Sequence, residues 1–298
     1  MNFPISAAVA AALFAAAPLA DATQNISKHA TVAADASIDV SNVAGRVDVM
    51  AWDRNEVELT AVLDDDKDKL EFEASDRQVR IKVVTEAHHF SDNEHDANLT
   101  LKIPKGARIS AETVSADITV TGLLGEQKLE TVSGEVKTQA YDVPVKVSTV
   151  SGDGTISGNG GKAAVSVETI SGTVAVSGVR GSYDGEVVSG TLTINLAAAE
   201  RLHAKSISGD IDARAELLPS ARVEMETVSG SIALTMKPPV NAEFDLESFS
   251  GDIRNCFGKE ARDKNRYGPG SELSFTQGSG GARVSINSLS GDIKVCDR

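Results

Sequence analysis

The chain has 298 residues, a formal net charge of -14 at pH 7 and a sequence pI of about 4.8. A nucleic acid or an anionic lipid surface would need a basic stripe, so this acidic balance argues against both as ligands. Charged residues at 24% and apolar residues at 41% exclude a disordered chain, and 25 glycines with 4% aromatic residues indicate many tight turns around small side chains.

The first 22 residues are predicted to be a secretory signal peptide. An alanine-rich apolar run extends from Ile5 to Ala20, and the small residues Ala20 and Ala22 flank Asp21 as the rule for cleavage after Ala22 requires. The run is short for a membrane span, which makes an uncleaved anchor the less favoured alternative. We therefore expect an exported protein, periplasmic or at the cell surface, that is not an integral membrane protein after cleavage.

Residues 23–106 are predicted to form an N-terminal β-strand region that leads into a repeat array. Apolar and polar residues alternate there in short runs, which is typical of strands. The segment from Ser41 to Val47 resembles a degenerate copy of the later repeat. A polar segment holds the best metal candidates, His88, His89 and His95. Their spacing matches no zinc site, so we favour a solvated loop and predict no metal or other cofactor.

From residue 107 to residue 298 one motif recurs, with Thr-Val-Ser-Gly-Asp-Ile as its fullest form. Successive motif serines lie 18, 18, 20, 18, 19, 21, 21 and 40 residues apart. The serines are Ser115, Ser133, Ser151, Ser171, Ser189, Ser208, Ser229, Ser250 and Ser290, and the glycines that follow are Gly134, Gly152, Gly172, Gly190, Gly209, Gly230, Gly251 and Gly291. Such a period is typical of repeat proteins in which each unit buries its apolar face only against its neighbours.

Each repeat is predicted to contain a strand, a glycine-centred corner, a second strand and a turn. Valine, isoleucine and threonine dominate, and glycine interrupts every window of helical length. We predict an all-β fold, a β-solenoid similar to a single-stranded β-helix, with rungs of about 20 residues and the motif at each corner. A β-sandwich is the alternative, but it does not require near-identical corners at a constant period.

The polar residues of the motif are predicted to be structural. Stacked rungs would place their hydroxyls one above another, where each could donate a hydrogen bond to the next. A serine nucleophile would need a base beside it, and His203 is alone near the copy at Ser208, so no catalytic residue is predicted. The acidic residues after the glycine could bind calcium, but we favour a turn capped by its own side chain.

The two cysteines occupy the same place in two repeats, because Cys256 lies six residues after Ser250 and Cys296 six residues after Ser290. Residues 257–280 carry no motif and are predicted to be a polar loop insertion. If that insertion loops out, the cysteines lie on adjacent rungs about 4.8 Å apart, which is within disulfide range. We predict a Cys256–Cys296 disulfide, with two buried thiols as the alternative.

The tract from Val47 to Val57, the step from Ile103 to Gly106 and the repeated corners resemble the DUF4097 family of bacterial β-strand repeat proteins, which are often labelled adhesins. The resemblance implies a β-solenoid exported to the cell envelope and supplies no catalytic residues. It therefore implies a non-enzymatic adhesin-like or scaffolding module whose partner is an unknown protein or envelope component.

The alternative function is a carbohydrate-active enzyme of the β-helix type, a hydrolase or lyase that acts on an envelope or extracellular polysaccharide. Such an enzyme would need several Asp, Arg or Lys side chains that converge on one face. The outward charges are expected to form a mixed, solvated stripe instead, which favours the interaction module; they are Glu130, Lys146, Glu168, Lys205, Glu224 and Glu226.

Overall fold

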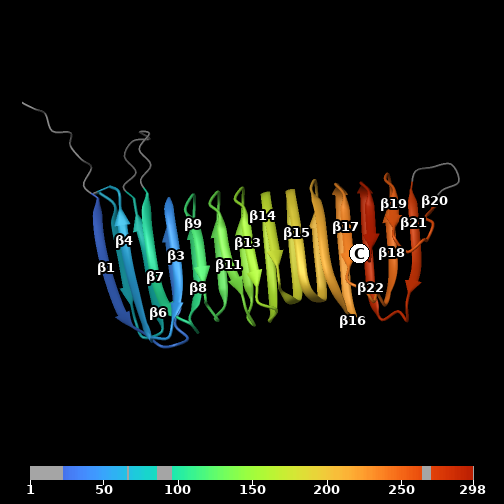
Figure 1. Cartoon of the computed structure of the whole chain (residues 1–298). Helices are drawn as coiled ribbons and strands as arrows, with labels where there is room; N and C mark the ends of the chain where they lie inside the picture. The colour runs from blue at the N-terminus through green and yellow to red at the C-terminus, as the bar shows by residue number, and fades with distance from the viewer. Residues whose placement is uncertain (1–22, 66, 86–95, 264–269, 298) are drawn as a thin grey trace, which may run out of the picture.

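The computed structural model describes residues 23–65, 67–85, 96–263 and 270–297. In these residues the fold is all-β and solenoid-like, with strands stacked side by side from β1 at one end to β21 and β20 at the other (Figure 1). None of the described segments is a helix of the length and apolarity that crossing a membrane requires. The predicted signal peptide, residues 1–22, and the metal candidates His88, His89 and His95 lie outside the described residues.

The strands have the following bounds: β1 Gln24–Thr31, β2 Ser37–Asn42, β3 Gly45–Trp52, β4 Glu56–Leu63, β5 Lys69–Ala74, β6 Gln78–Val84, β7 Ala97–Pro104, β8 Arg108–Thr113, β9 Asp117–Thr121, β10 Gln127–Thr131, β11 Val136–Ala140, β12 Val145–Thr149, β13 Gly154–Gly158, β14 Lys162–Ser177, β15 Arg180–Ser206, β16 Asp210–Ser229, β17 Ile232–Met236, β18 Ala242–Ser248, β19 Ile253–Asn255, β20 Arg262–Asp263, β21 Ser271–Gln277, β22 Ala282–Ser290 and β23 Ile293–Cys296.

The strands that precede the motif form a parallel row, here called row A. It begins with β6 and β2 and continues through β8, β10, β12, β14, β15, β16, β22 and β18. The register brings equivalent motif residues together, so that Thr131 lies opposite both Thr113 and Thr149. The degenerate copy of the motif from Ser41 to Val47 has the same register, because Asn42 lies opposite Thr113.

The strands that follow the motif form a second parallel row, here called row B. Its order is β7, β3, β9, β11, β13, β14, β15, β16, β17, β23 and β19. The long strands β14, β15 and β16 contribute to both rows because they continue through a corner or a turn. One rung is therefore one strand of row A and the next strand of row B.

The core lies between the two rows and consists of small and branched apolar side chains. Residues of row A such as Val147 and Val167, and of row B such as Val174 and Ile194, are at most 1% exposed. Close stacking of the rungs also explains the glycine after each motif serine. A Cβ atom on Gly209 would lie 1.9 Å from the carbonyl oxygen of Gly190 in the preceding rung, which no side chain can occupy.

Antiparallel strands close both ends of the stack. At the N-terminal end β1 pairs with β4, β4 with β7, and β5 with β6. At the C-terminal end β21 pairs with β18 and also with β20, so the segment 257–280 contains two strands and is not simply the loop that the sequence predicts. Strand β21 forms because its apolar and polar residues alternate. This alternation places Phe275 on Phe244, with their ring centroids 4.6 Å apart, and β21 thereby covers the end of row A.

Near the C-terminal end the order of the rungs in space differs from their order in the chain. Strand β22 lies between β16 and β18, and β23 lies between β17 and β19. The last repeat of the chain is therefore inserted between two earlier repeats. It is held there by a Cys256–Cys296 disulfide with a Cα–Cα distance of 4.8 Å, which confirms the predicted bridge.

A candidate binding groove along the motif corners

The second position of the motif exposes an apolar side chain in every copy. These ten residues, 39 to 54% exposed, are here called the ridge; in spatial order they are Val43, Val114, Val132, Val150, Ile170, Val188, Ile207, Val228, Leu289 and Phe249. Single exposed apolar residues are common on soluble proteins, but a continuous line of them marks a candidate interaction surface.

The ridge follows from strand alternation and from the stacking of the rungs. The first motif residue points inward, as Thr169 does with 4% exposure, so the next residue points outward. Backbone hydrogen bonds align successive corners: the Ser133 amide donates to the Val114 carbonyl at 2.8 Å, and the Ser208 amide donates to the Val188 carbonyl at 2.7 Å. Ridge side chains therefore repeat at the strand spacing of about 4.8 Å.

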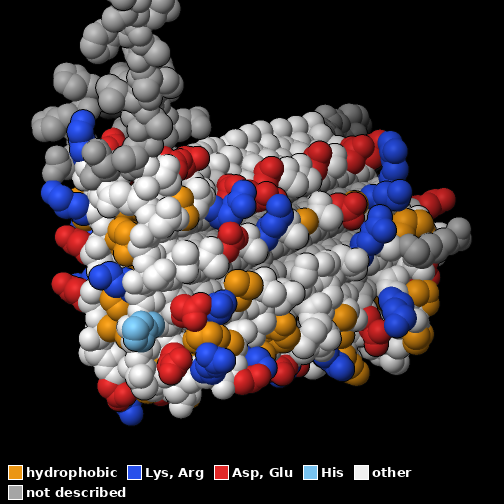
Figure 2. Space-filling view, turned by 60° about the vertical axis from the view of Figure 1, so that its left-hand side comes forward, with side chains coloured by type: hydrophobic (Ala, Val, Ile, Leu, Met, Phe, Trp, Pro, Cys, Tyr) orange, Lys and Arg blue, Asp and Glu red, His pale blue; other side chains and the backbone are white. Residues whose placement is uncertain are grey.

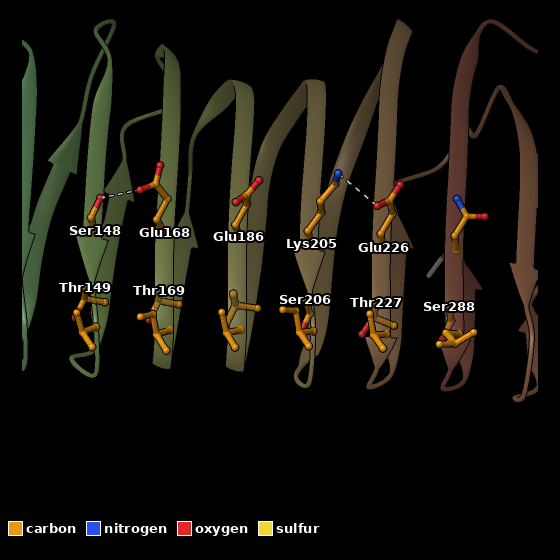
Figure 3. A pocket seen from close by; sticks show the side chains of 18 of the residues that line it. Ser148, Thr149, Glu168, Thr169, Glu186, Lys205, Ser206, Glu226, Thr227 and Ser288 are labelled. Carbon is orange, nitrogen blue, oxygen red and sulfur yellow. Dashed lines mark hydrogen bonds and ion pairs between the residues drawn. The ribbon is translucent and has the colours of Figure 1, made fainter.

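A groove of about 1070 Å³ runs beside the ridge across several rungs. Its opposite wall is here called the acidic row and lies two residues before the ridge in each repeat. In spatial order the acidic row is Glu112, Glu130, Ser148, Glu168, Glu186, Lys205, Glu226, Asn287 and Glu247, and all but Glu112 line the groove. Figure 3 shows Ser148, Glu168, Glu186, Lys205 and Glu226 side by side above the buried hydroxyl residues of the motif.

Ion pairs neutralise part of the acidic row. Lys146 Nζ lies 2.7 Å from Glu168 Oε1, and Lys205 Nζ lies 3.4 Å from Glu226 Oε2. The hydrogen bond to Glu168 raises the pKa of Lys146 above its usual 10.5 and outweighs burial, which lowers it. Glu186 is exposed and has no ion-pair partner among the described residues, so the middle of the groove presents a carboxylate beside apolar side chains.

The outward charges predicted from the sequence divide between the groove and the neighbouring face. Glu130, Glu168, Lys205 and Glu226 line the groove, while Lys146 and Glu224 lie two residues earlier on the outer face of row A. Figure 2 shows acidic and basic side chains interspersed along the stack on the side in view.

The first hydroxyls of the motif are buried, but they do not form the continuous ladder that the sequence predicts. The hydroxyls of Thr113 and Thr131 are 2.9 Å apart, and Thr131 Oγ1 also accepts from the Gly134 amide at 3.0 Å. Farther along, four hydroxyls have no hydrogen-bond partner among the described residues, namely those of Thr169, Ser206, Thr227 and Ser288. Rungs about 4.8 Å apart hold equivalent hydroxyls beyond hydrogen-bond distance unless the side chains turn toward each other.

The second serines of the motif are exposed and bond to backbone, not to one another. The hydroxyls of Ser115, Ser133 and Ser151 donate to the carbonyls of ridge residues in the preceding rung, at 3.2, 3.3 and 3.2 Å. These serines therefore fix the backbone of the ridge.

His203, the histidine that the sequence places near the motif copy at Ser208, lies beside a carboxylate: its Nδ1 is 3.3 Å from Asp184 Oδ2.

The acidic residues after the glycine join neighbouring rungs, whereas the sequence predicts that each caps its own turn. Asp117 Oδ1 accepts from the Glu135 amide at 2.8 Å, and Asp153 Oδ1 accepts from the Thr173 amide at 2.7 Å. Parallel stacking in register brings each carboxylate beside the backbone of the adjacent rung, which explains the difference. In the part of the chain that the structure describes, no group of three or more His, Cys, Asp or Glu side chains is arranged to hold a metal ion.

The ridge is the feature that the sequence interpretation misses. The motif repeats an apolar residue, Val, Ile, Leu or Phe, at a position that strand alternation places outward. An apolar residue that recurs at an outward position in every copy was the available signal. The period alone predicts buried apolar positions and gives no reason to inspect the outward ones.

The Toastrack DUF4097 family model matches residues 36–296 of the chain. Among solved structures, a "putative adhesin" from Bacteroides fragilis NCTC 9343 is 15% identical, with 91% of this chain and 97% of that chain covered and a TM-score of 0.48. A "putative lipid binding protein" from Parabacteroides distasonis ATCC 8503 is 13% identical, with 91% and 96% covered and a TM-score of 0.47. No curated protein matches the chain. The match over residues 36–296 shows that the chain belongs to the Toastrack DUF4097 family.

Proposed function

We propose that this protein is a non-enzymatic interaction module of the cell envelope, adhesin-like or scaffolding in role, that binds its partner along the ridge. The observation that carries the proposal is the ridge itself, ten aligned apolar side chains that are 39 to 54% exposed. Apolar surface in water is unfavourable, and a partner that covers the ridge would remove it from solvent. The stacked rungs supply a straight, repetitive surface for this purpose.

The contents of the groove favour binding over the alternative, a carbohydrate-active enzyme of the β-helix type. Hydrolysis of a glycosidic bond needs a carboxylic acid and a carboxylate held on opposite sides of one bond. The glutamates of the acidic row instead lie in one line along the stack, and several of them pair with lysines, among them Glu130, Glu168 and Glu226. This arrangement supports electrostatic recognition of a partner.

We propose further that the fold is a β-solenoid similar to a single-stranded β-helix, with rungs of about 20 residues and the motif at each corner. Parallel pairings between residues 18 to 21 apart support this architecture. We propose residues 107–298 as the array and residues 23–106 as the region that leads into it.

Export is the second part of the proposal. The predicted signal peptide and the Cys256–Cys296 disulfide support an oxidising compartment, the periplasm or the cell surface. Protease treatment of intact and lysed cells distinguishes the two locations. Cleavage in intact cells is expected for a surface adhesin, and cleavage only after lysis for a periplasmic module; a protein that fractionates with the cytoplasm in reduced form would contradict export.

Site-specific photo-crosslinking in cells tests the binding surface. A benzoylphenylalanine at Val188 on the ridge is expected to give a discrete adduct with a partner. The matched control is Leu124, which is apolar and 47% exposed but lies outside the ridge. Equal adduct formation from both positions, or none from Val188 and from two further ridge positions, would contradict the proposal.

A further inference from the structure

We propose that the ridge and the acidic row together bind a basic amphipathic α-helix that lies along the axis of the stack. This inference depends on the proposed function and adds the chemistry and shape of the partner. Three observations support it: the spacing of the ridge residues, the charge of the acidic row and the length of the groove.

The spacing of the ridge fits one apolar side chain per helical turn. Ridge residues repeat at about 4.8 Å, and an α-helix advances about 5.4 Å per turn, a difference of roughly 0.6 Å per rung. An extended strand instead presents same-face side chains about 6.7 Å apart, so it loses register with the ridge after roughly two or three rungs. A helix keeps its apolar face on the ridge for about four turns.

The charge of the acidic row selects a basic partner. Its nine positions hold six glutamates and a single lysine, Lys205, which pairs with Glu226 at 3.4 Å. Lys128 and Lys146, which lie just outside the row, pair with Glu130 and Glu168, so three lysines balance six glutamates only in part and the row stays net acidic. Near the middle, Glu168 and Glu186 lie opposite each other on adjacent strands. Lys or Arg side chains that flank the apolar face of a helix would meet these carboxylates.

The same charge argues against two other occupants of the groove. A second copy of this chain would bring its own acidic row against the first, and like charges that face each other oppose association. An anionic lipid surface meets the same repulsion, which the net charge of -14 strengthens.

The length of the groove is also that of a short helix. Seven ridge residues line it, from Val150 to Phe249 in spatial order. Six steps between them span about 29 Å, which a helix of about 19 residues covers. An apolar stripe at positions i, i+3, i+4 and i+7 would place anchors near successive rungs over about four turns, the range in which the helix and the ridge stay in register.

The test uses four labelled synthetic peptides of about 18 residues with the full chain. The first has Leu on one helical face and Lys on both sides of it; the second has the same composition with Leu and Lys in strict alternation. The third is a scrambled version of the first, and the fourth replaces Lys by Glu. We expect saturable 1:1 binding of the first peptide in fluorescence anisotropy, a gain of helical circular dichroism on binding, and at least about tenfold weaker binding of the others.

Variants of the protein assign the binding to the site. Ile170→Ser with Ile207→Ser is expected to weaken the first peptide at least about tenfold, because both anchors lie on the ridge. Glu168→Gln with Glu186→Gln is expected to weaken it several-fold and to reduce its dependence on salt. Leu124→Ser, and Glu71→Gln with Glu73→Gln on the exposed face of β5, are the matched controls and should leave the affinity unchanged.

Each other outcome overturns a defined part of the inference. Tighter binding of the alternating peptide would replace the helix by an extended strand, and equal binding of all basic peptides would reduce the effect to net charge. Preference for the acidic peptide, or binding of the full chain to vesicles of anionic lipid offered in place of the peptides, would reverse the charge assignment. If no peptide depends on the ridge while crosslinks at Val188 persist, the helix inference fails and the proposed function stands; if both are lost, both fail.

Discussion

The middle of the stack and its C-terminal end are built from the same motif but assembled differently. From β8 to β17 the rungs follow one another in space as they do in the chain. Beyond β17 the last repeat of the chain, β22 and β23, lies between β16–β17 and β18–β19. The motif therefore fixes the row and the register of a strand, but it does not fix which repeat becomes the neighbour.

Two features distinguish the C-terminal end and account for its different order. The connection from Cys256 to Ala282 is long enough to pass around a rung, whereas the turns of the middle are short. The Cys256–Cys296 disulfide then joins the inserted repeat to its neighbour. Covalent linkage thus stabilises the place where chain order alone gives no guidance.

Loss of the disulfide is expected to have the largest effect and to act at the C-terminal end. Removal of a link that closes 40 residues, in the double variant Cys256→Ser with Cys296→Ser, is expected to lower the free energy of unfolding by about 4 kcal/mol. Amide hydrogen exchange should rise in β22 and β23 before it rises in β10 and β12. A uniform rise across both regions would contradict the distinction between them.

Close packing in the middle of the stack should make replacement of a motif glycine nearly as destabilising as loss of the disulfide. Gly209→Ala is expected to lower the free energy of unfolding by about 3 kcal/mol, because the new Cβ would lie 1.9 Å from the Gly190 carbonyl oxygen. Gly258→Ala is the control in the C-terminal segment: its Cβ meets nothing within 4 Å, and only its φ of +69° opposes alanine, at a cost of about 1 kcal/mol. Chemical denaturation measures both values, and equal costs would show that the rungs are not closely stacked at Gly209.

The buried first hydroxyls of the motif should respond differently to removal at Thr131 and at Thr169. Thr131→Val is expected to lower the free energy of unfolding by about 1 to 2 kcal/mol. Thr131 Oγ1 accepts from the Gly134 amide, and its removal leaves that buried donor unsatisfied. Thr169→Val should be neutral or stabilising by up to about 1 kcal/mol, since the Thr169 hydroxyl has no partner among the described residues. Val187 already occupies the equivalent position of the next rung. A similar cost at both sites in chemical denaturation would contradict the observed hydrogen bonding.

Tyr183 provides the smallest effect, which is confined to alkaline pH. Burial, with a further contribution from Asp184, raises the pKa of Tyr183 above its usual 10.0. The unfolded chain then loses this proton at lower pH than the folded chain, so stability is present in full below pH 10 and falls as the pH rises above it. Tyr183→Phe should reduce that alkaline loss and leave neutral stability nearly unchanged, because the Tyr183 hydroxyl has no partner among the described residues. Tyr141→Phe is the matched control, and an equal change in its alkaline unfolding curve would contradict this assignment.

Local pattern and long-range arrangement differ in how far the sequence predicts them. The recurrence of the motif and the period-two alternation around Val147 or Ile286 suffice to predict an all-β repeat fold, and the equivalent positions of Cys256 and Cys296 suffice to predict the bridge. The exchange of the last two repeats does not follow from these patterns, because both copies carry the same motif and fit either place.

The candidate site is predictable only in part for a related reason. The charges Glu130, Glu168 and Lys205 are recognisable as outward positions, since strand alternation determines them. The groove itself depends on the alignment of corners such as Val188 and Ile207 across rungs, which the backbone hydrogen bonds establish in three dimensions. A repeat unit considered alone shows one exposed apolar residue, and only the stack makes it a ridge.

The most direct test of the ridge as a binding surface is the photo-crosslinking yield at Val188 in a chain that carries Ile170→Ser and Ile207→Ser. Both substituted residues are more than half exposed, at 51% and 54%, so each change should alter the free energy of unfolding by no more than about 0.5 kcal/mol. We predict that the adduct disappears while the denaturation midpoint is unchanged. An undiminished adduct from this stable variant would contradict the conclusion that the ridge is the surface through which the protein binds.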